Sequence, residues 1–367
     1  MTKRKQSVNA LELDTNMQIQ KIDDPAFRWY SPLEQPFHIA GFGWLQDEQL
    51  YRRLPAKPEW QLPEAVNNLA NCTAGGQIRF TTNAASLAVK VKLSGTANMY
   101  HMPATGQCGF DCYIGEPGEQ HYVGTSRYDH TQTEYESVFY QNMERESRVI
   151  TLNFPLYQGV EEVWVGIDPI GHIAAPATYT SNRKVLIYGT SITQGGCATR
   201  PGMAYPNILS RRIHQEFLNL GFSGNGKGEP ELAHILSEIP DPACLVLDYE
   251  ANCVSTEQLQ KTLPEFIRIF REKHAEIPIL VISRITYAKD KFEAQLMQDK
   301  MDRKQFQMQT VNQLRELGDV NIYFHDGSDL LGENAHECTV DGVHPTDLGF
   351  MRMADGLTPV LKKILPE

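Results

Sequence analysis

Hydrophobic and polar positions follow different patterns in the two halves of the chain. In the second half, short apolar runs occupy 184–188, 219–223, 244–248, 278–283 and 320–324, and each has the length of a buried strand. The segments between these runs repeat apolar residues every three to four positions, as amphipathic helices do. Buried strands that alternate with helices form parallel sheets with right-handed crossovers, so residues 183–367 are predicted to fold as a parallel α/β domain.

Several helix signals accompany this pattern. Pro230 stands where a first helical turn tolerates proline, and 262–265 reads as a capping box before a further helix. The stretch 291–317 is long and amphipathic, and Thr346 can cap a last helix that extends to about Leu361. A helical stripe is also predicted from Tyr205, Leu209, Ile213, Phe217 and Leu220.

The first half alternates apolar and polar residues over short runs, which is typical of half-buried strands. The runs lie at 77–81, 86–93, 109–114, 149–154 and 162–167, with turn residues between them. This spacing predicts an antiparallel β-sandwich or jelly roll over residues 1–175, and 168–183 reads as a linker. The aromatic residues of the segment 27–63, Trp29, Trp44, Tyr51 and Trp60 among them, fit either a sugar-stacking surface or an ordinary core.

Composition narrows the classes of function. A net charge of −11 argues against nucleic acid or an anionic membrane as a partner. No window approaches the roughly 18 apolar residues of a membrane span, and residues 1–20 are too polar for a signal peptide, so a cytoplasmic location is expected. Seven irregularly spaced cysteines do not form a disulfide framework, which also favours a reducing compartment.

Polar residues follow the predicted strands, at the edge where open α/β sheets place their active sites. Ser191 comes directly after the first strand, and Asp341 and His344 follow the fifth. A serine hydroxyl becomes a good nucleophile when a base takes its proton, and His344 is a suitable base. Asp341, three residues earlier, can orient the imidazole and stabilise its charged form. The purely structural alternatives are that Ser191 only forms a turn and that Asp341 only stabilises a turn or caps a helix.

Residues at the same edge of the sheet can also form an oxyanion hole. Three hydrogen-bond donors are candidates: the Ser191 N–H, the Gly224 N–H and the Asn252 side-chain amide. Glycine suits position 224 because a Cβ would crowd the approach of a carbonyl. Asn252 alternatively caps its own loop backbone.

These residues resemble the four conserved blocks of the SGNH hydrolase (GDSL-type esterase) superfamily. Gly189-Thr-Ser-Ile192, Gly224, Asn252 and Asp341-x-x-His344 occur in the superfamily's order, over about residues 183–367. The resemblance implies a flavodoxin-like three-layer α/β/α fold with Ser191 as nucleophile, His344 as base, Asp341 as its partner and Gly224 with Asn252 in the oxyanion hole.

The likeness extends to the first half and has two departures. Gly-Phe-Asp-Cys-Tyr at 109–113 resembles the Gly-x-Asp-Leu-Tyr signature of a domain found before one bacterial subgroup of these hydrolases. Asp111 and Tyr113 carry this signature, and they either contact the active site or fold their own domain. Thr190 replaces the common Asp before the serine, and the third block reads Tyr249-Glu-Ala-Asn-Cys253 instead of Gly-x-Asn-Asp.

The function implied is a serine esterase that acts on short acyl esters, acetyl above all, with an acylated carbohydrate as a candidate substrate and no cofactor. The alternatives are a lipase- or thioesterase-type acyl hydrolase and a catalytically silent sugar-binding protein. The sequence leaves the oligomeric state open.

Other residues allow alternatives to the serine mechanism. A metal-dependent hydrolase would use Cys197, Cys253 or Cys338 with His336 or His344, but their spacing matches no zinc pattern, and no metal is expected. Arg200 and Arg284 can meet a substrate, although surface ion pairs are the more common role of such residues.

Overall fold

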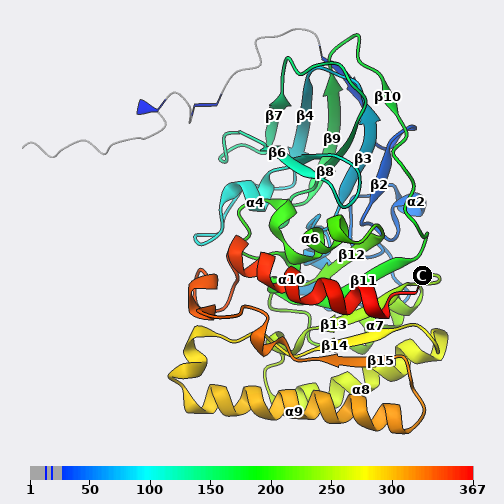
Figure 1. Ribbon diagram of the computed structural model, residues 1–367, viewed down its shortest axis with the longest axis vertical. Helices are drawn as coiled ribbons and strands as arrows, with labels where there is room; N and C mark the ends of the chain where they lie inside the picture. Colours follow the sequence, from blue (N-terminus) through cyan, green and yellow to red (C-terminus); the bar gives the residue numbers. More distant parts are fainter. Residues whose placement is uncertain (1–12, 15–17, 20–26, 367) are drawn as a thin grey trace, which may run out of the picture.

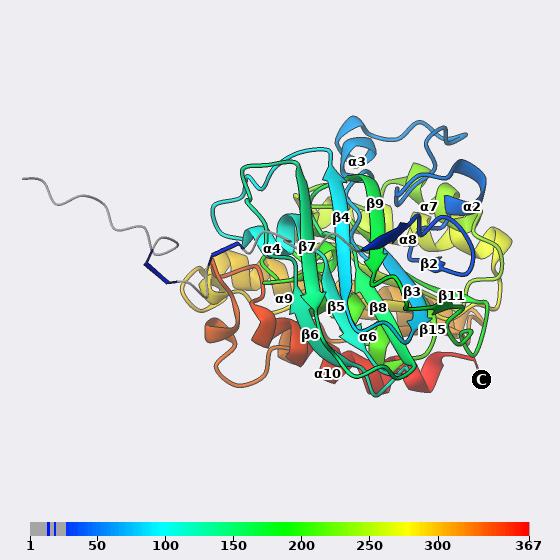
Figure 2. The same ribbon diagram turned by 90° about the horizontal axis from the view of Figure 1, so that it is seen from above.

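A computed structural model describes residues 13–14, 18–19 and 27–366 of the chain. The described residues form a β-sandwich followed by an α/β unit. In Figure 1 the sandwich lies above the α/β unit. Seen from above, the strands of the sandwich lie over the α/β unit (Figure 2). None of the helices in these residues combines the length and apolarity needed to cross a membrane.

The sandwich consists of two antiparallel sheets, as predicted. One sheet has the order β1 (Arg28–Tyr30), β9 (Val160–Ile167), β4 (Leu87–Leu93) and β7 (Glu134–Tyr140). The other has the order β10 (Ile173–Ala174), β3 (Gln77–Thr82), β8 (Arg148–Asn153), β5 (Asp111–Ile114) and β6 (His121–Thr125), and β2 (His38–Ala40) also pairs with β3.

Alternation along the strands builds the sandwich core. In β4, Val89 and Val91 are buried between the sheets, while Lys90 points outward and pairs with Glu136 at 3.0 Å. The predicted strand runs of the first half all fall on observed strands, which confirms the antiparallel β prediction for this region.

The α/β unit is built on a parallel sheet with the strand order β12 (Glu216–Gly221), β11 (Lys184–Gly189), β13 (Cys244–Asp248), β14 (Ile279–Ile282) and β15 (Ile322–His325). One face packs on α5 (Ser191–Gln194), α6 (Tyr205–Arg212) and α10 (Asp347–Ile364). The other packs on α7 (Pro230–Ser237), α8 (Thr256–Lys273) and α9 (Ala294–Glu316). This is the three-layer α/β/α arrangement that the sequence predicts.

Shorter helices connect these elements. They are α2 (Leu45–Glu48), α3 (Glu64–Leu69), α4 (Ala104–Cys108), and the 3₁₀ turns η1 (Pro201–Met203), η2 (Glu250–Asn252), η3 (Ala288–Lys291), η4 (Gly327–Asp329) and η5 (Ala335–Cys338).

Two predicted helix bounds are wrong. Helix α6 ends at Arg212, and Phe217 and Leu220 lie in β12, because parallel pairing of Phe217 with Val185 takes this segment into the sheet. Helix α8 begins at Thr256, well before the capping box predicted at 262–265, since the Ser255 side chain caps it by accepting a hydrogen bond from the Gln258 N–H at 3.2 Å.

Thr346 precedes α10 as predicted, but it does not cap the helix through its side chain. Its hydroxyl instead donates to the Cys338 carbonyl at 3.2 Å. The bond ties the start of α10 to the loop that leads into Asp341.

The segment between β2 and β3 also contributes to the α/β unit. Leu54 and Val66 belong to the core between the parallel sheet and α7–α8. The fully buried Arg53 donates to the carbonyls of Leu69 and Cys72 at 2.7 Å and of Asn219 at 3.2 Å, and thereby covers the edge strand β12. Burial lowers the pKa of Arg53 to about 10. The division at residues 175–183 stays a prediction.

Candidate active site

Ser191 is the first residue of α5, directly after the extended Thr190 that follows β11. The Thr190 hydroxyl accepts a hydrogen bond from the Ile192 N–H at 3.2 Å, and the Thr193 hydroxyl accepts one from the Thr190 N–H at 3.3 Å. This reciprocal capping fixes the turn on which the serine sits. Threonine therefore performs locally what an aspartate at this position would do as a cap.

The structure brings Ser191, His344 and Asp341 into one chain of hydrogen bonds. Ser191 Oγ lies 2.8 Å from His344 Nε2, and His344 Nδ1 lies 2.7 Å from Asp341 Oδ2. The serine and histidine are separated by 153 residues in sequence, so only the fold places them together. The order nucleophile, base and orienting carboxylate is that of a serine hydrolase triad.

The two oxygens of Asp341 have separate tasks. Oδ1 accepts the backbone N–H groups of Val343 at 3.0 Å and His344 at 2.8 Å, which leaves Oδ2 for the imidazole. Partial burial alone would raise the pKa of Asp341, but these hydrogen bonds outweigh it and hold the pKa below its usual value. Asp341 is thus both a turn-forming carboxylate and the partner of His344.

The predicted oxyanion donors lie on neighbouring loops. The Asn252 Nδ2 donates to the Phe222 carbonyl at 3.1 Å, which ties η2 to the loop that carries Gly224. One of the two amide hydrogens is used in this bond, and the other can be offered to an oxyanion. The side chain therefore binds the neighbouring loop instead of capping its own.

The backbone gives a second reason for glycine at position 224, beside the predicted room for a substrate carbonyl. Its φ is +67°, a left-handed conformation that glycine adopts at little cost, while an added Cβ would meet no protein atom within 4 Å. The open space beside Gly224 leaves room for a substrate.

Asp248 is a site residue that the sequence reading missed. It ends β13, and its Oδ2 accepts hydrogen bonds from the Tyr205 hydroxyl at 2.7 Å and the Thr193 hydroxyl at 3.1 Å. Burial raises the pKa of Asp248 to about 7, although both hydrogen bonds oppose that rise. This carboxyl supports α5 from beneath, and its position at a strand end was the available signal.

The Gly-x-Asp-x-Tyr signature of the sandwich binds the loop after the nucleophile. The Asp111 Oδ2 accepts hydrogen bonds from Arg200 Nη1 at 2.9 Å and the Gly202 N–H at 2.8 Å, and Oδ1 accepts one from Asn153 at 2.7 Å. The Tyr113 hydroxyl accepts a further hydrogen bond from Arg200. The signature therefore joins the two parts of the protein beside the active site.

Neither of the two arginines considered in the sequence forms a surface ion pair. Arg200 is largely buried against Asp111, and Arg284 is buried at 5% exposure with Asp290 at 2.8 Å. The Arg284 N–H also donates to Glu250 at 2.8 Å, and Glu250 begins the turn that carries Asn252. The surface-pair expectation is wrong because packing against neighbouring elements encloses both guanidinium groups.

The aromatic residues of segment 27–63 are used in packing between elements. Trp60 is 39% exposed and stacks on His234 of α7 with ring centroids 3.8 Å apart. Tyr51 packs against Phe154 at 5.0 Å. Within the described part of this segment, these contacts favour the core reading over a free sugar-stacking surface.

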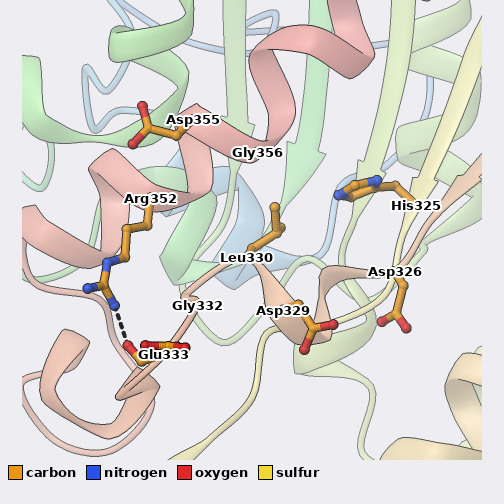
Figure 3. A pocket seen from close by; sticks show the side chains of 9 residues that line it. All are labelled: His325, Asp326, Asp329, Leu330, Gly332, Glu333, Arg352, Asp355 and Gly356. Atoms are coloured by element: carbon orange, nitrogen blue, oxygen red, sulfur yellow. Dashed lines mark hydrogen bonds between the residues drawn. The ribbon is translucent and has the colours of Figure 1, made fainter.

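A separate pocket of about 610 Å³ opens after β15, between η4 and α10 (Figure 3). Two of its carboxylates are engaged in ion pairs: Asp326 pairs with Lys304 at 2.9 Å, and Asp355 pairs with Arg212 at 2.7 Å. Arg352 donates to the Glu333 carbonyl at 2.7 Å, the bond drawn in Figure 3. None of the predicted site residues lines this pocket.

Comparison with known proteins agrees with this geometry. The GDSL-like lipase/acylhydrolase family model matches residues 182–362, and the model for the N-terminus of SGNH-hydrolase-type esterases matches residues 27–173. A Bacteroides ovatus protein described as a GDSL-like lipase is 31% identical, with a TM-score of 0.84 over 92% of this chain and 98% of that one. The chain belongs to the GDSL-like lipase/acylhydrolase family.

More distant members of this fold are also similar. The salicylyl-acyltransferase SsfX3 from a tetracycline biosynthetic pathway is 19% identical, with a TM-score of 0.75 over 94% of this chain and 99% of that chain. A family two carbohydrate esterase from Cellvibrio japonicus is 14% identical, with a TM-score of 0.59 over 92% and 98%. No curated protein matches the sequence significantly. These likenesses establish the fold that the GDSL-like chain shares with both enzymes.

Proposed function

We propose that this GDSL-like protein is a serine esterase that hydrolyses short acyl esters, acetyl esters above all, with an acylated carbohydrate as its natural substrate. The observation that carries the proposal is the chain of hydrogen bonds from Ser191 through His344 to Asp341, at 2.8 and 2.7 Å. The 2.8 Å between Ser191 Oγ and His344 Nε2 lies within the range in which a base can take a proton from a nucleophile. The 2.7 Å between His344 Nδ1 and Asp341 Oδ2 is the hydrogen bond that orients this base.

In the proposed acylation step, Ser191 Oγ attacks the ester carbonyl carbon while His344 Nε2 takes the hydroxyl proton. Asp341 holds the neutral ring with Nδ1 protonated and stabilises the imidazolium once it forms. The Ser191 and Gly224 N–H groups and the Asn252 amide donate hydrogen bonds that stabilise the negative charge on the carbonyl oxygen. His344 then gives its proton to the departing alcohol, which leaves an acyl group on Ser191.

Deacylation repeats the sequence with water in place of the alcohol. His344 takes a proton from water, the hydroxide adds to the acyl carbonyl, and the collapse of the tetrahedral species returns the proton to Ser191 Oγ. The carboxylic acid is released and the enzyme is restored. Every proton in the cycle passes through His344.

The short acyl group and the sugar are supported less directly. Ser191 is only 8% exposed, and the β-sandwich closes over the loop that follows it, which favours a small acyl group. The Cellvibrio japonicus neighbour is a carbohydrate esterase, and at 14% identity its likeness lies in the fold alone. The acyl group and the alcohol are therefore the parts of the proposal that need direct measurement.

The test is hydrolysis of p-nitrophenyl acetate, butyrate and octanoate by the wild type and by Ser191→Ala, with a chelator present. We expect turnover that falls with chain length and a loss of at least about 10³-fold in the variant. Equal activity of the two proteins would refute the assignment of Ser191. Inactivity on every ester would favour a silent sugar-binding protein, and a preference for octanoate would favour a lipase.

The alcohol is tested with acetylated monosaccharides and acetylated xylo-oligosaccharides, with acetate release as the measurement. Release from a sugar with a kcat/KM above that for p-nitrophenyl acetate supports the carbohydrate assignment. A value for every sugar far below that of the simple ester would contradict it.

A further inference from the structure

Three metal-binding side chains from both parts of the protein meet next to the proposed nucleophile. The candidate ligand atoms of His101, Cys197 and His344 all lie within 4.8 Å of one another. His101 belongs to the sandwich, in the connection from β4 to α4, while Cys197 follows Ser191 by six residues. The catalytic proposal uses His344 but gives neither of the other two a task.

His101 is not satisfied by the protein around it. Its buried Nδ1 has no hydrogen-bond partner among the described residues, and its Nε2 lies 4.0 Å from Asp341 Oδ2, beyond hydrogen-bonding distance. The ring stacks on Tyr100 with centroids 4.5 Å apart and meets His344 edge-on at 5.6 Å. A buried imidazole nitrogen without a partner calls for a ligand that the protein does not itself supply.

The loop that carries His101 is held firmly. The buried Gln107 accepts hydrogen bonds from the Asn98 N–H at 2.9 Å and the Met99 N–H at 3.0 Å, and donates to the Met102 carbonyl at 2.6 Å. These bonds lie on both sides of His101, so the position of the ring is set by the fold.

The loop that carries Cys197 is fixed against the segment that follows His101. The Thr105 hydroxyl donates to the Thr199 carbonyl at 2.6 Å. A Cβ at Gly106 would lie 2.2 Å from the Ala198 carbonyl oxygen, so glycine is needed for this close approach. The contact holds His101 and Cys197 near each other even though they belong to different parts of the fold.

We propose that His101, Cys197 and His344 form a binding site for Zn²⁺ and that the bound ion inhibits ester hydrolysis. Two imidazole nitrogens and one thiolate are a donor set that zinc prefers, with water as a fourth ligand. On binding, the Cys197 thiol releases its proton to solvent, one Zn–S and two Zn–N bonds form, and five of the six waters of the hydrated ion leave, so that one water remains as the fourth ligand. The negative charge of Asp341 lies next to the site and favours a cation.

Inhibition follows from the role proposed for His344. An ion on Nε2 would take the lone pair that accepts the Ser191 proton, and an ion on Nδ1 would displace Asp341. Either arrangement removes the base from the reaction. The inhibitory part of this inference rests on the proposed esterase function, whereas metal binding does not.

The experiment titrates the chelator-treated full-length protein with ZnCl₂ and follows heat and p-nitrophenyl acetate hydrolysis. Binding of CoCl₂ provides a third readout, because a cobalt–thiolate bond absorbs in the near ultraviolet. The variants are His101→Ala and Cys197→Ser, with His336→Ala and Cys72→Ser as controls, since His336 is exposed and Cys72 is the least buried cysteine. Thermal unfolding without metal checks that each variant folds.

We expect one ion per chain, inhibition that a chelator reverses, and a cobalt–thiolate band that Cys197→Ser abolishes. His101→Ala and Cys197→Ser should each weaken binding by more than the 10–100-fold that loss of an outer-shell partner costs. The two controls should match the wild type.

Absence of one-to-one binding, or binding that neither His101→Ala nor Cys197→Ser weakens, would overturn the site. If the protein hydrolyses no ester, heat and cobalt absorption still decide whether the site exists. If zinc binds at these ligands and hydrolysis continues unchanged, the inhibitory role and the assignment of His344 as the base are both overturned, while ester hydrolysis itself stands.

Discussion

Asp111 in the β-sandwich and Arg200 in the α/β unit form a buried ion pair, with Arg200 Nη1 2.9 Å from Asp111 Oδ2. Asp111 has no exposed surface, and Arg200 follows the proposed nucleophile by nine residues. The aspartate of the sandwich signature therefore acts on the loop beside Ser191, not within its own sheet alone. We therefore expect that loss of this contact lowers both stability and activity.

Replacing Asp111 with Ala should destabilise the protein by about 3–5 kcal/mol, because it leaves a largely buried Arg200 without its partner. The measurement is urea unfolding, and kcat for p-nitrophenyl acetate should fall in the folded fraction. Asp241→Ala is the matched control, since Asp241 pairs with Arg183 at an exposed position. Equal effects of the two substitutions would contradict the interpretation of Asp111.

Asp341→Asn should lower kcat by about 10²–10⁴-fold with little change in KM, since the amide cannot stabilise the imidazolium of His344. The fold should persist, because the oxygen that accepts the Val343 and His344 N–H groups can be retained. Steady-state kinetics with circular dichroism measure both effects. A variant with full kcat would show that a backbone carbonyl or water supports the base instead.

Asn252→Ala should lower kcat by about 10²–10³-fold, as expected for the loss of one oxyanion donor. The control is Asn321→Ala. The Asn321 side chain donates a hydrogen bond to the Glu276 carbonyl at 2.8 Å, outside the candidate active site. A loss confined to stability, with unchanged kcat for the folded enzyme, would assign Asn252 to loop support through its bond to Phe222.

Asp248 should impose a pH dependence on stability. Its pKa is raised to about 7 in the folded protein from a reference value of 3.8, so the folded state binds more protons than the unfolded state between these values. Stability from this group is therefore present at low pH and is lost as pH rises towards about 7. Relative to Asp248→Asn, the wild type should become less stable between pH 4 and pH 7.

Urea unfolding of both proteins at several pH values measures this difference, and a difference that stays constant with pH would contradict the assignment.

Much of the fold could be predicted because local pattern and tertiary environment agree. The run 244–248 coincides with β13 because it is buried on both faces and bounded by turns. The strand predicted at 219–223 is observed about three residues earlier, as β12 at Glu216–Gly221. The prediction begins too late because the polar Glu216 and Asn219 interrupt the apolar pattern of this strand. Both side chains are buried and hydrogen-bonded: Glu216 accepts from the Gly41 N–H at 2.9 Å and Asn219 donates to the Thr193 carbonyl at 2.8 Å.

The candidate site residues that directly follow strands, and that match the conserved sequence blocks in order, were predictable. Ser191, Asp341 and His344 were found in this way, and the structure places them together. From the sequence, support from the sandwich was one of two alternatives for Asp111 and Tyr113. The contacts of Arg53 and His101 were not predictable, because they depend on how the two parts pack. Neither residue lies in a local pattern that indicates its partner.

The central claim is that Ser191 is the nucleophile activated by His344, and covalent labelling tests it most directly. The wild type is incubated with diethyl p-nitrophenyl phosphate, and peptide mass spectrometry locates the phosphoryl group. The account predicts one label per chain, on Ser191, with release of p-nitrophenol, labelling slowed at least about 10²-fold in His344→Ala, and no label in Ser191→Ala. A label on another residue, or equal labelling of Ser191→Ala, would contradict it.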